Sequence, residues 1–188
     1  MVLFGSTSSD QNDRPDGRLE RYLKKLAAGE KDALQPLYAE TRSAVYGFAL
    51  SILKNAPDAE DVLQDTYLQI SAAAGGYHPR GKPMAWILTI TKNLARMRLR
   101  EKSRLAEWPE DGEEPPHLPP VAEEDRIVLE AALRALSDEE SQIVMLYVVS
   151  GLKHREIAAM LELPLPTVLS KYHRALKKLK KHLSEEVV

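Results

Sequence analysis

The sequence predicts an all-α protein made of two small helical domains joined by a flexible, acidic, proline-rich linker. Apolar side chains recur at spacings of three and four residues in both halves of the 188-residue chain, as in amphipathic helices. Neither half shows the strict alternation of apolar and polar residues that indicates strands. Prolines and like charges interrupt the helical pattern in the middle of the chain. We therefore divide the chain into a disordered tail (1–16), a first domain (17–105), the linker (106–122) and a second domain (123–188).

The first domain is predicted to hold helices at about 17–28, 31–53, 57–73 and 83–104. Gly29 ends the first of these helices, and Pro36 is compatible with the second only in its first turn. Asn55 and the following Ala-Pro-Asp form a turn and a helix start, and Gly75-Gly76 ends that helix before a loop that reaches Pro83. The apolar side of the last helix is expected at Trp86, Ile87, Ile90, Leu94 and Met97.

The second domain is predicted to hold helices at about 123–135, 138–149, 154–162 and 166–184. Ser137, with Glu140 three residues later, gives the pattern of a capping box at the start of the second of these helices. The last two helices, one short and one long and basic, are separated by a tight turn, which is typical of a helix-turn-helix. The core side of the long helix is expected at Val168, Tyr172, Ala175, Leu176 and Leu179. Its more exposed residues are expected to be Thr167, Ser170, Lys171, His173, Arg174 and Lys178.

The net charge of −2 excludes a protein that is basic overall, but it results from cancellation between segments. Residues 106–126 carry eight acidic side chains and one basic one, whereas residues 82–104 carry seven basic and one acidic. Residues 171–182 carry six basic side chains and no acidic one. Such basic helices can neutralise the phosphates of nucleic acid, although a solvated surface helix gives the same pattern. The acidic segment, taken alone, indicates a solvated spacer.

An acidic face is predicted on the helix at 57–73, where Asp58, Asp61, Gln64 and Asp65 follow one another at helical spacing. Carboxylates repel DNA, so this face suits a basic protein partner. An ordinary solvated first helical turn explains the same residues equally well.

Composition excludes several classes of chemistry. The chain has no cysteine, which excludes disulfides, thiolate catalysis and cysteine-based zinc sites. Its five histidines are scattered without nucleophile–base or metal-ligand spacing, so we expect no enzyme, metal, cofactor or small-molecule substrate. No apolar stretch approaches the roughly 20 residues of a membrane span, and the amino-terminal residues lack the parts of a signal peptide. We therefore expect a cytoplasmic protein that does not insert into a membrane.

Three segments together resemble the bacterial sigma-70 family of RNA polymerase sigma factors. They are Asp58-Ala-Glu-Asp-Val-Leu-Gln-Asp-Thr-Tyr-Leu68, Pro83-Met-Ala-Trp-Ile-Leu-Thr-Ile-Thr-Lys-Asn-Leu-Ala95, and the helix-turn-helix. The small size and two-domain layout are similar to the extracytoplasmic-function branch, group IV, and the resemblance covers about residues 18–184. It implies that the first domain is sigma region 2 and the second is region 4. It also implies a factor that binds core RNA polymerase, recognises the −10 and −35 promoter elements and helps to open the DNA.

The resemblance assigns partners to three groups of residues. Binding to the clamp helices of the polymerase β′ subunit is implied for Asp58, Asp61, Gln64, Asp65 and Leu68. Binding to the −10 element, with capture of an unstacked base, is implied for Tyr77, His78, Arg80, Lys82, Lys92, Asn93, Arg96 and Arg100. Binding to the −35 element as duplex is implied for Thr167, Ser170, Lys171, Arg174 and Lys178. The family also implies contact with the polymerase β flap, a linker that passes toward the active centre and, in many members, an anti-sigma factor.

Some residues depart from the family's pattern. Lys153 stands where a small capping residue often precedes the helix-turn-helix. Leu169 replaces a phosphate-binding basic residue near the start of the recognition helix, within Pro166-Thr-Val-Leu-Ser-Lys171. There it could contact a thymine methyl group or a protein partner. The loop before Pro83-Met84 lacks the usual aromatic residue, so −10 and −35 recognition are both expected to differ in detail.

Two other functions fit parts of the sequence. A free-standing helix-turn-helix regulator would use the first domain for dimerisation or ligand binding, but it leaves the acidic helix and the acidic linker unexplained. A helical adaptor or inhibitory protein would use these helices for protein contacts alone. Transcription from a discrete start site on addition of core polymerase distinguishes a sigma factor from both.

Overall fold

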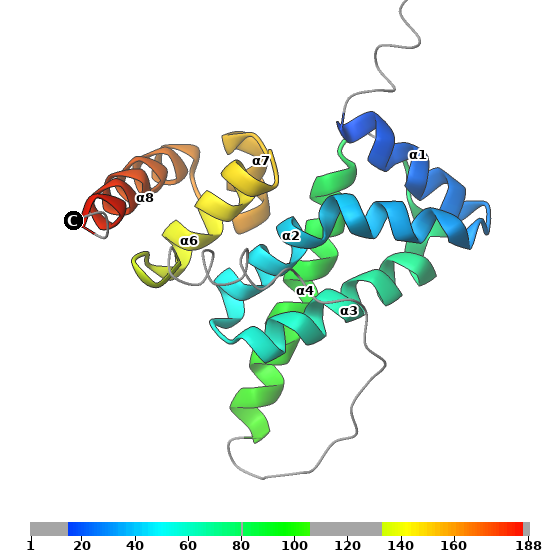
Figure 1. Cartoon of the computed structure of the whole chain (residues 1–188), viewed down its shortest axis with the longest axis horizontal. Coiled ribbons are helices and arrows are strands. Elements are labelled where there is room, and N and C mark those ends of the chain that lie inside the picture. Colours follow the sequence, from blue (N-terminus) through cyan, green and yellow to red (C-terminus); the bar gives the residue numbers. More distant parts are fainter. Residues whose placement is uncertain (1–14, 80, 106–132, 186–188) are drawn as a thin grey trace, which may run out of the picture.

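The computed structural model describes residues 15–79, 81–105 and 133–185, which form helices and connecting turns without a β-strand (Figure 1). The first domain contains α1 (Pro15–Ala27), α2 (Leu34–Leu53), α3 (Ala56–Ala73) and α4 (Pro83–Leu105). Short 3-10 turns, Lys31–Ala33 and Ala74–Gly76, precede α2 and follow α3. The second domain contains α6 (Asp138–Val144), a π-helical turn (Met145–Val149), α7 (His154–Leu161) and α8 (Leu165–Glu185). The predicted all-α fold class is therefore confirmed.

Several sequence predictions concern residues that the structure does not describe. They are the linker at 106–122, Arg80, and all but the last part of the predicted helix at 123–135. The predicted tail also lies outside the described residues, apart from its last two positions. These two positions belong to α1, which begins at Pro15, where a proline loses no intrahelical hydrogen bond.

The helix boundaries of the first domain follow local signals in the sequence. Helix α3 begins after Asn55, whose Oδ1 accepts a hydrogen bond from the backbone N–H of Asp58 at 3.0 Å. Pro36 lies in the first turn of α2, as expected, because a 3-10 turn takes up the preceding residues. Gly29 follows α1 with a φ of +87°, a conformation that glycine adopts at little cost.

The core of the first domain is centred on α2. Helices α1, α3 and α4 all pack against α2, so buried residues occur at successive positions from Ala44 to Ser51 rather than along one stripe. The Tyr67 hydroxyl lies 2.6 Å from the hydroxyl of Thr41, which in turn donates to the Leu37 carbonyl at 2.7 Å. The Tyr67 ring packs edge-on against Tyr38, with ring centroids 4.8 Å apart. These contacts fix α3, and with it the acidic face, against α2.

The second domain begins with the predicted capping box. The backbone N–H of Ser137 donates to the Glu140 carboxylate at 3.0 Å, which confirms the predicted start of α6. The end of the predicted helix widens into a π-helical turn, where the backbone N–H of Ser150 donates to the Met145 carbonyl at 3.1 Å. Gly151 then reverses the chain toward α7 with a φ of +70°.

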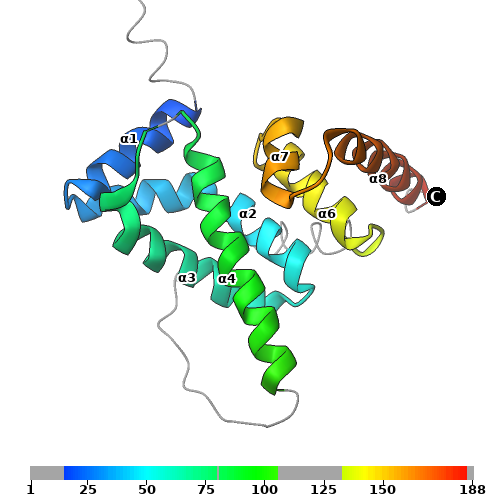
Figure 2. The ribbon, with the colours of Figure 1, turned by 180° about the vertical axis from the view of Figure 1, so that it is seen from behind.

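The two domains pack against each other, an arrangement that the sequence did not predict. Buried residues of the second domain, among them Ile143, Leu146 and Ile157, belong to the same apolar cluster as the core of the first domain. Figures 1 and 2 show α6 beside the carboxyl-terminal part of α2, and α7 beside α4. The Lys54 ammonium at the end of α2 donates to the Ser141 hydroxyl at 2.8 Å and lies 3.6 Å from the Asp138 carboxylate.

Two apolar side chains lie elsewhere than predicted. Met97 is 51% exposed, because the fully buried residues of α4 are Ile87, Leu88, Thr91 and Ala95, whereas Trp86, Ile90 and Leu94 pack against the core as predicted. Leu176 is 39% exposed, because α8 contacts α6 and α7 through a line that includes Val168 and Ala175 and leaves Leu176 beside it. Spacing alone gives the period of a helix face, whereas the neighbouring helix determines which face is covered.

None of the helices in the described ranges has the length and apolar composition needed to cross a membrane.

Candidate polymerase and nucleic-acid interfaces

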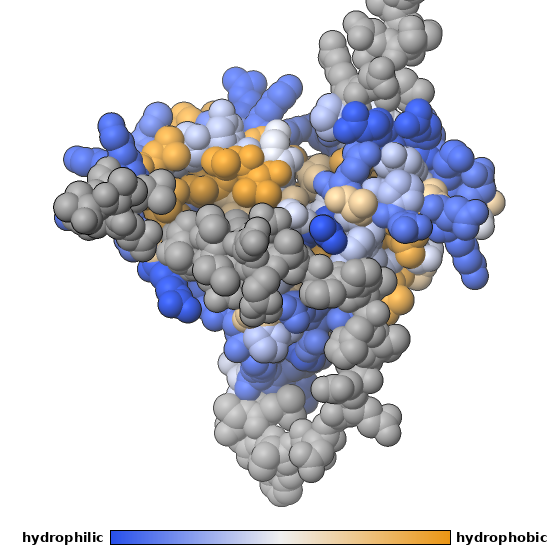
Figure 3. Space-filling view, viewed as in Figure 1, coloured by the Kyte–Doolittle hydropathy of each residue, from blue (hydrophilic) through white to orange (hydrophobic). Residues whose placement is uncertain are grey.

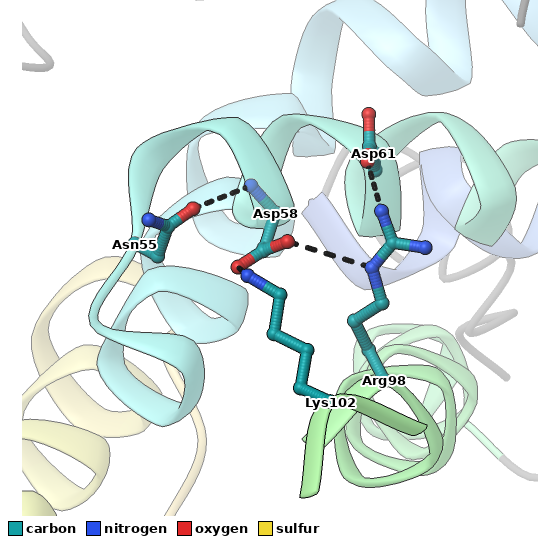
Figure 4. A network of polar contacts seen from close by, with 5 residues as sticks. All are labelled: Asn55, Asp58, Asp61, Arg98 and Lys102. Carbon is teal, nitrogen blue, oxygen red and sulfur yellow. Dashed lines mark hydrogen bonds and ion pairs between the residues drawn. The ribbon is translucent and has the colours of Figure 1, made fainter. Parts of the chain in front are cut away.

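One carboxylate of the predicted acidic face points into the protein. Asp58 lies in the first turn of α3 and is 5% exposed. One of its oxygens lies 3.5 Å from the Arg98 Nε and the other accepts a hydrogen bond from the Lys102 ammonium, both from α4 (Figure 4). Asp58 therefore links α3 to α4 and exposes little surface to a partner.

The remaining acidic residues of α3 lie closer to solvent. Asp61 accepts a hydrogen bond from Arg98 and remains 37% exposed (Figure 4). Asp65, one turn further along, is exposed. Partial burial raises the pKa of Asp65, and the charges of Asp61 and Glu101 raise it further, while the Arg98 charge acts in the opposite direction. The like charges of Asp61 and Glu101 thus add to the effect of burial at Asp65.

Two uncharged residues border this surface. Leu68 is 61% exposed on the same helix. The Gln64 Oε1 is enclosed and has no hydrogen-bond partner among the described residues. The exposed part of the acidic face is thus formed by Asp61, Asp65 and Leu68.

The loop before α4 is held by the first helix. The Tyr77 hydroxyl and the Gly81 backbone N–H both donate to the Glu20 carboxylate of α1, at 3.3 and 3.1 Å. Burial, followed by the Glu20 charge, raises the pKa of Tyr77 to about 12. The Tyr77 ring packs edge-on against Trp86 at 5.0 Å, so this tyrosine anchors the loop, whereas His78 is exposed.

Several basic residues of α4 and of the preceding loop contact the second domain. Lys92 is 9% exposed, and its ammonium donates a hydrogen bond to the Met160 carbonyl at 2.7 Å. The Glu162 carboxylate lies 3.6 Å from Lys92 and 3.7 Å from Arg96. Lys82, just before α4, forms a 2.8 Å ion pair with Glu156 of α7. Asn93 and Arg100, by contrast, are exposed.

The recognition helix α8 presents only part of its predicted DNA-binding set to solvent. Lys171 and Lys178 each form a 2.6 Å ion pair with α6, through Glu139 and Glu140 respectively. Thr167 is half-buried, and its carbonyl accepts a hydrogen bond from the Ser170 hydroxyl at 3.0 Å. Ser170, Arg174 and Lys178 are exposed, as predicted, although Lys178 is also paired.

His173 and Lys177 lie on the same exposed side of α8 but were not predicted as DNA contacts. Helical spacing could have included them, since each lies three residues after Ser170 or Arg174. The ion pairs of Lys171 and Lys178 could not be inferred in this way, because their partners belong to a different helix.

Exposed apolar side chains gather on the second domain next to this helix. Val148 is 59% exposed, and Leu169 and Leu176 of α8 are 38% and 39% exposed. Tyr147 stacks on His154 with ring centroids 4.3 Å apart. Figure 3 shows the apolar surface over α7 and the neighbouring part of α8. Such a patch on a small domain is typical of a protein-binding surface.

Within the described residues, no group of three or more potential ligands is arranged to hold a metal ion.

The fold and these surfaces define a class: a helical protein of two domains, of which the second carries a helix-turn-helix with a basic recognition helix. Models of sigma-70 region 2 and sigma-70 region 4 match residues 37–105 and 126–179. The chain belongs to the sigma-70 family of RNA polymerase sigma factors, as the sequence motifs predicted.

The chain is similar to several named sigma factors, some of them of the extracytoplasmic-function (ECF) branch. The chain is 31% identical over 172 residues to the ECF RNA polymerase sigma factor SigK of Mycobacterium sp. (strain KMS), covering 86% of this chain and 89% of the relative. It is 29% identical over 167 residues to the RNA polymerase sigma factor CarQ of Myxococcus xanthus, covering 87% of this chain and 96% of the relative. Its fold is similar to that of the sigma factor RpoE of Bartonella quintana, which was solved in complex with the anti-sigma factor NepR. The TM-score is 0.60 at 23% identity, and the match covers 80% of this chain and 96% of the RpoE chain. These findings favour a sigma factor over the regulator and the adaptor.

Proposed function

We propose that this chain binds core RNA polymerase and directs transcription initiation at a specific set of promoters. The observation that carries this proposal is the presence, in one chain, of domains that match sigma regions 2 and 4. The chain has no catalytic step of its own in this scheme, because bond formation belongs to the polymerase. A cytoplasmic location follows, since polymerase and promoter DNA must both be accessible.

The first domain docks on the polymerase through the exposed part of the acidic face. Asp65 and Asp61 supply the charge for a basic or mixed partner surface such as the β′ clamp helices, and Leu68 supplies an apolar contact. Asp58 supports this surface from inside by holding α4 against α3. The apolar surface around Val148 suits docking of the second domain on the β flap.

The two promoter elements are assigned to different helices. The −10 element is bound by α4 and the loop before it, with Asn93 and Arg100 accessible in the described arrangement. The −35 element is read as duplex by the exposed side of α8, through Ser170 and Arg174 together with His173 and Lys177. An anti-sigma factor is a further proposed partner, because the similar RpoE structure contains one.

Run-off transcription on a genomic library tests the proposal. Core polymerase mixed with the full chain is expected to give transcripts with discrete start sites, whereas core polymerase alone gives none at those sites. The chain alone is expected to bind the same DNA weakly. Tight, specific duplex binding by the isolated chain, without transcripts on addition of core polymerase, would refute the sigma-factor proposal and favour a free-standing regulator.

Lys177→Met is expected to weaken binding of the reconstituted holoenzyme to −35 duplex DNA, because one phosphate contact is lost. The slope of the logarithm of the binding constant against the logarithm of the salt concentration should become shallower by about 1. Lys171→Met is the matched control within the same helix, since the Lys171 ammonium is already 2.6 Å from Glu139. Fluorescence anisotropy over a series of salt concentrations measures both slopes. An equal reduction in the two variants would contradict the assignment.

A further inference from the structure

The loop between α3 and α4 is tied to a helix that lies outside the matched part of the first domain. The sigma-70 region 2 model matches residues 37–105, whereas α1 spans Pro15–Ala27. Helix α1 packs against the 3-10 turn Ala74–Gly76 and against α4, the two elements that border the loop (Figure 2). Residues of α1 can therefore set the position of the loop although the region 2 model does not include them.

One carboxylate oxygen of α1 holds both ends of this loop. The Glu20 Oε1 accepts a hydrogen bond from the Tyr77 hydroxyl at 3.3 Å and another from the Gly81 backbone N–H at 3.1 Å. Among the described residues between these two donors, His78 and Pro79 are exposed. The two ends of the loop thus meet at a single atom, while the residues between them face solvent.

Glu20 is itself held in place by the packing of its helix. The adjacent Leu19 is 3% exposed and Leu23 is fully buried, so this side of α1 belongs to the core of the first domain. Arg18 of α1 also forms a 3.2 Å ion pair with Glu40 of α2. A hydrogen-bonding group on a packed helix is positioned more precisely than one on a loop.

The two donors are constrained as well. Tyr77 is 8% exposed, and its ring packs edge-on against Trp86 with ring centroids 5.0 Å apart. Gly81 has a φ of +67°, a left-handed conformation that glycine adopts at little cost. The hydrogen bonds to Glu20 therefore join groups whose positions are already restricted, and the loop is preorganised before it meets a ligand.

We propose that Glu20 is a positioning residue for −10 recognition, which fixes the loop at Tyr77 and Gly81 so that it presents one defined surface to the unpaired bases. The inference rests on the function proposed above, because it takes this loop and α4 as the −10-binding surface. In this scheme Glu20 does not touch DNA. Its effect is on specificity, because a loop that can rearrange adapts to a wrong base, whereas a fixed loop does not.

The first measurement is the environment of Trp86 in the free, full-length chain. The chain has two tryptophans, so Trp108→Phe leaves Trp86 as the single one. In this background, Glu20→Ala is expected to increase quenching of Trp86 fluorescence by acrylamide, because the Tyr77 ring that packs against it is released. Glu40→Ala is the matched control, since it removes a carboxylate whose contacts with α1 are to Arg18 and Tyr22, and it should leave quenching unchanged.

The second measurement is run-off transcription by the reconstituted holoenzyme from a mapped promoter and from templates with single base substitutions in its −10 element. Glu20→Ala is expected to reduce discrimination against the substituted templates by about fivefold, the lower end of the effect of one mismatched base pair. Glu20→Gln should retain most of the discrimination, because its amide oxygen still accepts hydrogen bonds. Glu40→Ala should discriminate as the parent chain does.

Two substitutions of Gly81 test the loop without a change in α1. Both Gly81→Ala and Gly81→Asn place a Cβ in open space, but alanine disfavours a φ of +67°, whereas asparagine tolerates it better. Gly81→Ala is therefore expected to lose discrimination as Glu20→Ala does, and Gly81→Asn to retain more of it. This pair keeps the proposal testable if Glu20→Ala unfolds the first domain.

Unchanged discrimination in both Glu20→Ala and Gly81→Ala would overturn the positioning role. An equal fall in transcription from every template would also overturn it, because Glu20 would then act on folding alone. Absence of discrete transcripts with the parent chain would instead contradict the proposed function, and the fluorescence of Trp86 does not depend on that result.

Discussion

Lys178→Met is expected to lower the free energy of unfolding of the second domain by about 2 kcal/mol. The Lys178 ammonium lies 2.6 Å from the Glu140 carboxylate, which is 5% exposed at its side chain. Removal of the ammonium leaves that carboxylate buried, with Ser137 as its remaining hydrogen-bond partner among the described residues. The expected cost lies between those of exposed and buried ion pairs because the Lys178 side chain is itself 48% exposed.

Hydrogen exchange of peptides from α6 and α8 measures this loss in the second domain alone. Lys177→Met is the matched control, because it removes the same charge from the adjacent position on the exposed side of the helix. We expect it to change stability by less than about 0.5 kcal/mol while weakening DNA binding, as described above. If Lys178→Met left hydrogen exchange unchanged but weakened DNA binding, the result would instead indicate that Lys178 contacts DNA.

The difference in unfolding free energy between the parent chain and Lys178→Met should depend on pH, which gives a second check on this prediction. Burial acts to raise the pKa of Glu140, but hydrogen bonds from Lys178 and Ser137 outweigh it, so its pKa lies below the usual value. A lowered pKa in the folded state means that ionised Glu140 contributes stability above its ordinary pKa and loses this contribution as pH falls through the lowered value. The difference between the parent chain and Lys178→Met should therefore be full at pH 7 and shrink below about pH 4.

The helices and their starts could be predicted because the signals are local. Asn55 and Ser137 each cap a helix with groups three residues away, and the glycine and proline positions restrict φ in the chain itself. Burial was less predictable. Met97 and Leu176 follow the helical period of their neighbours, but no helix among the described residues covers them.

The pairing of charges could not be predicted, and it is what changes the candidate sites. Glu140 and Lys178 are 38 residues apart, and Lys92 and Met160 are 68 apart, so no spacing rule connects them. A basic residue on a predicted DNA-binding helix is therefore a candidate whose availability depends on the rest of the fold. Lys171, Lys178 and Lys92 are engaged within the protein, whereas Arg174 and Lys177 are exposed.

Asp65→Lys is expected to lower the affinity of the chain for core RNA polymerase by about 10- to 100-fold, which corresponds to about 1.4 to 2.7 kcal/mol. A lysine there would present a positive charge to the basic partner for which the acidic face is proposed. Asp61 and Leu68 would remain, so binding should weaken without being abolished. Competition for core polymerase against a labelled parent chain measures the change.

The effect of the same substitution on folding is expected to have the opposite sign. The raised pKa of Asp65 means that its ionised form disfavours the folded state at neutral pH, because partial burial and then the like charges of Asp61 and Glu101 outweigh the Arg98 charge. Asp65→Lys should therefore leave the stability of the first domain unchanged or increase it, as measured by urea unfolding. Asp32→Lys, at an exposed position of the 3-10 turn before α2, controls for the change in net charge and should bind core polymerase normally. Equal loss of affinity in both variants would place polymerase docking elsewhere, since a general charge effect would then account for the result.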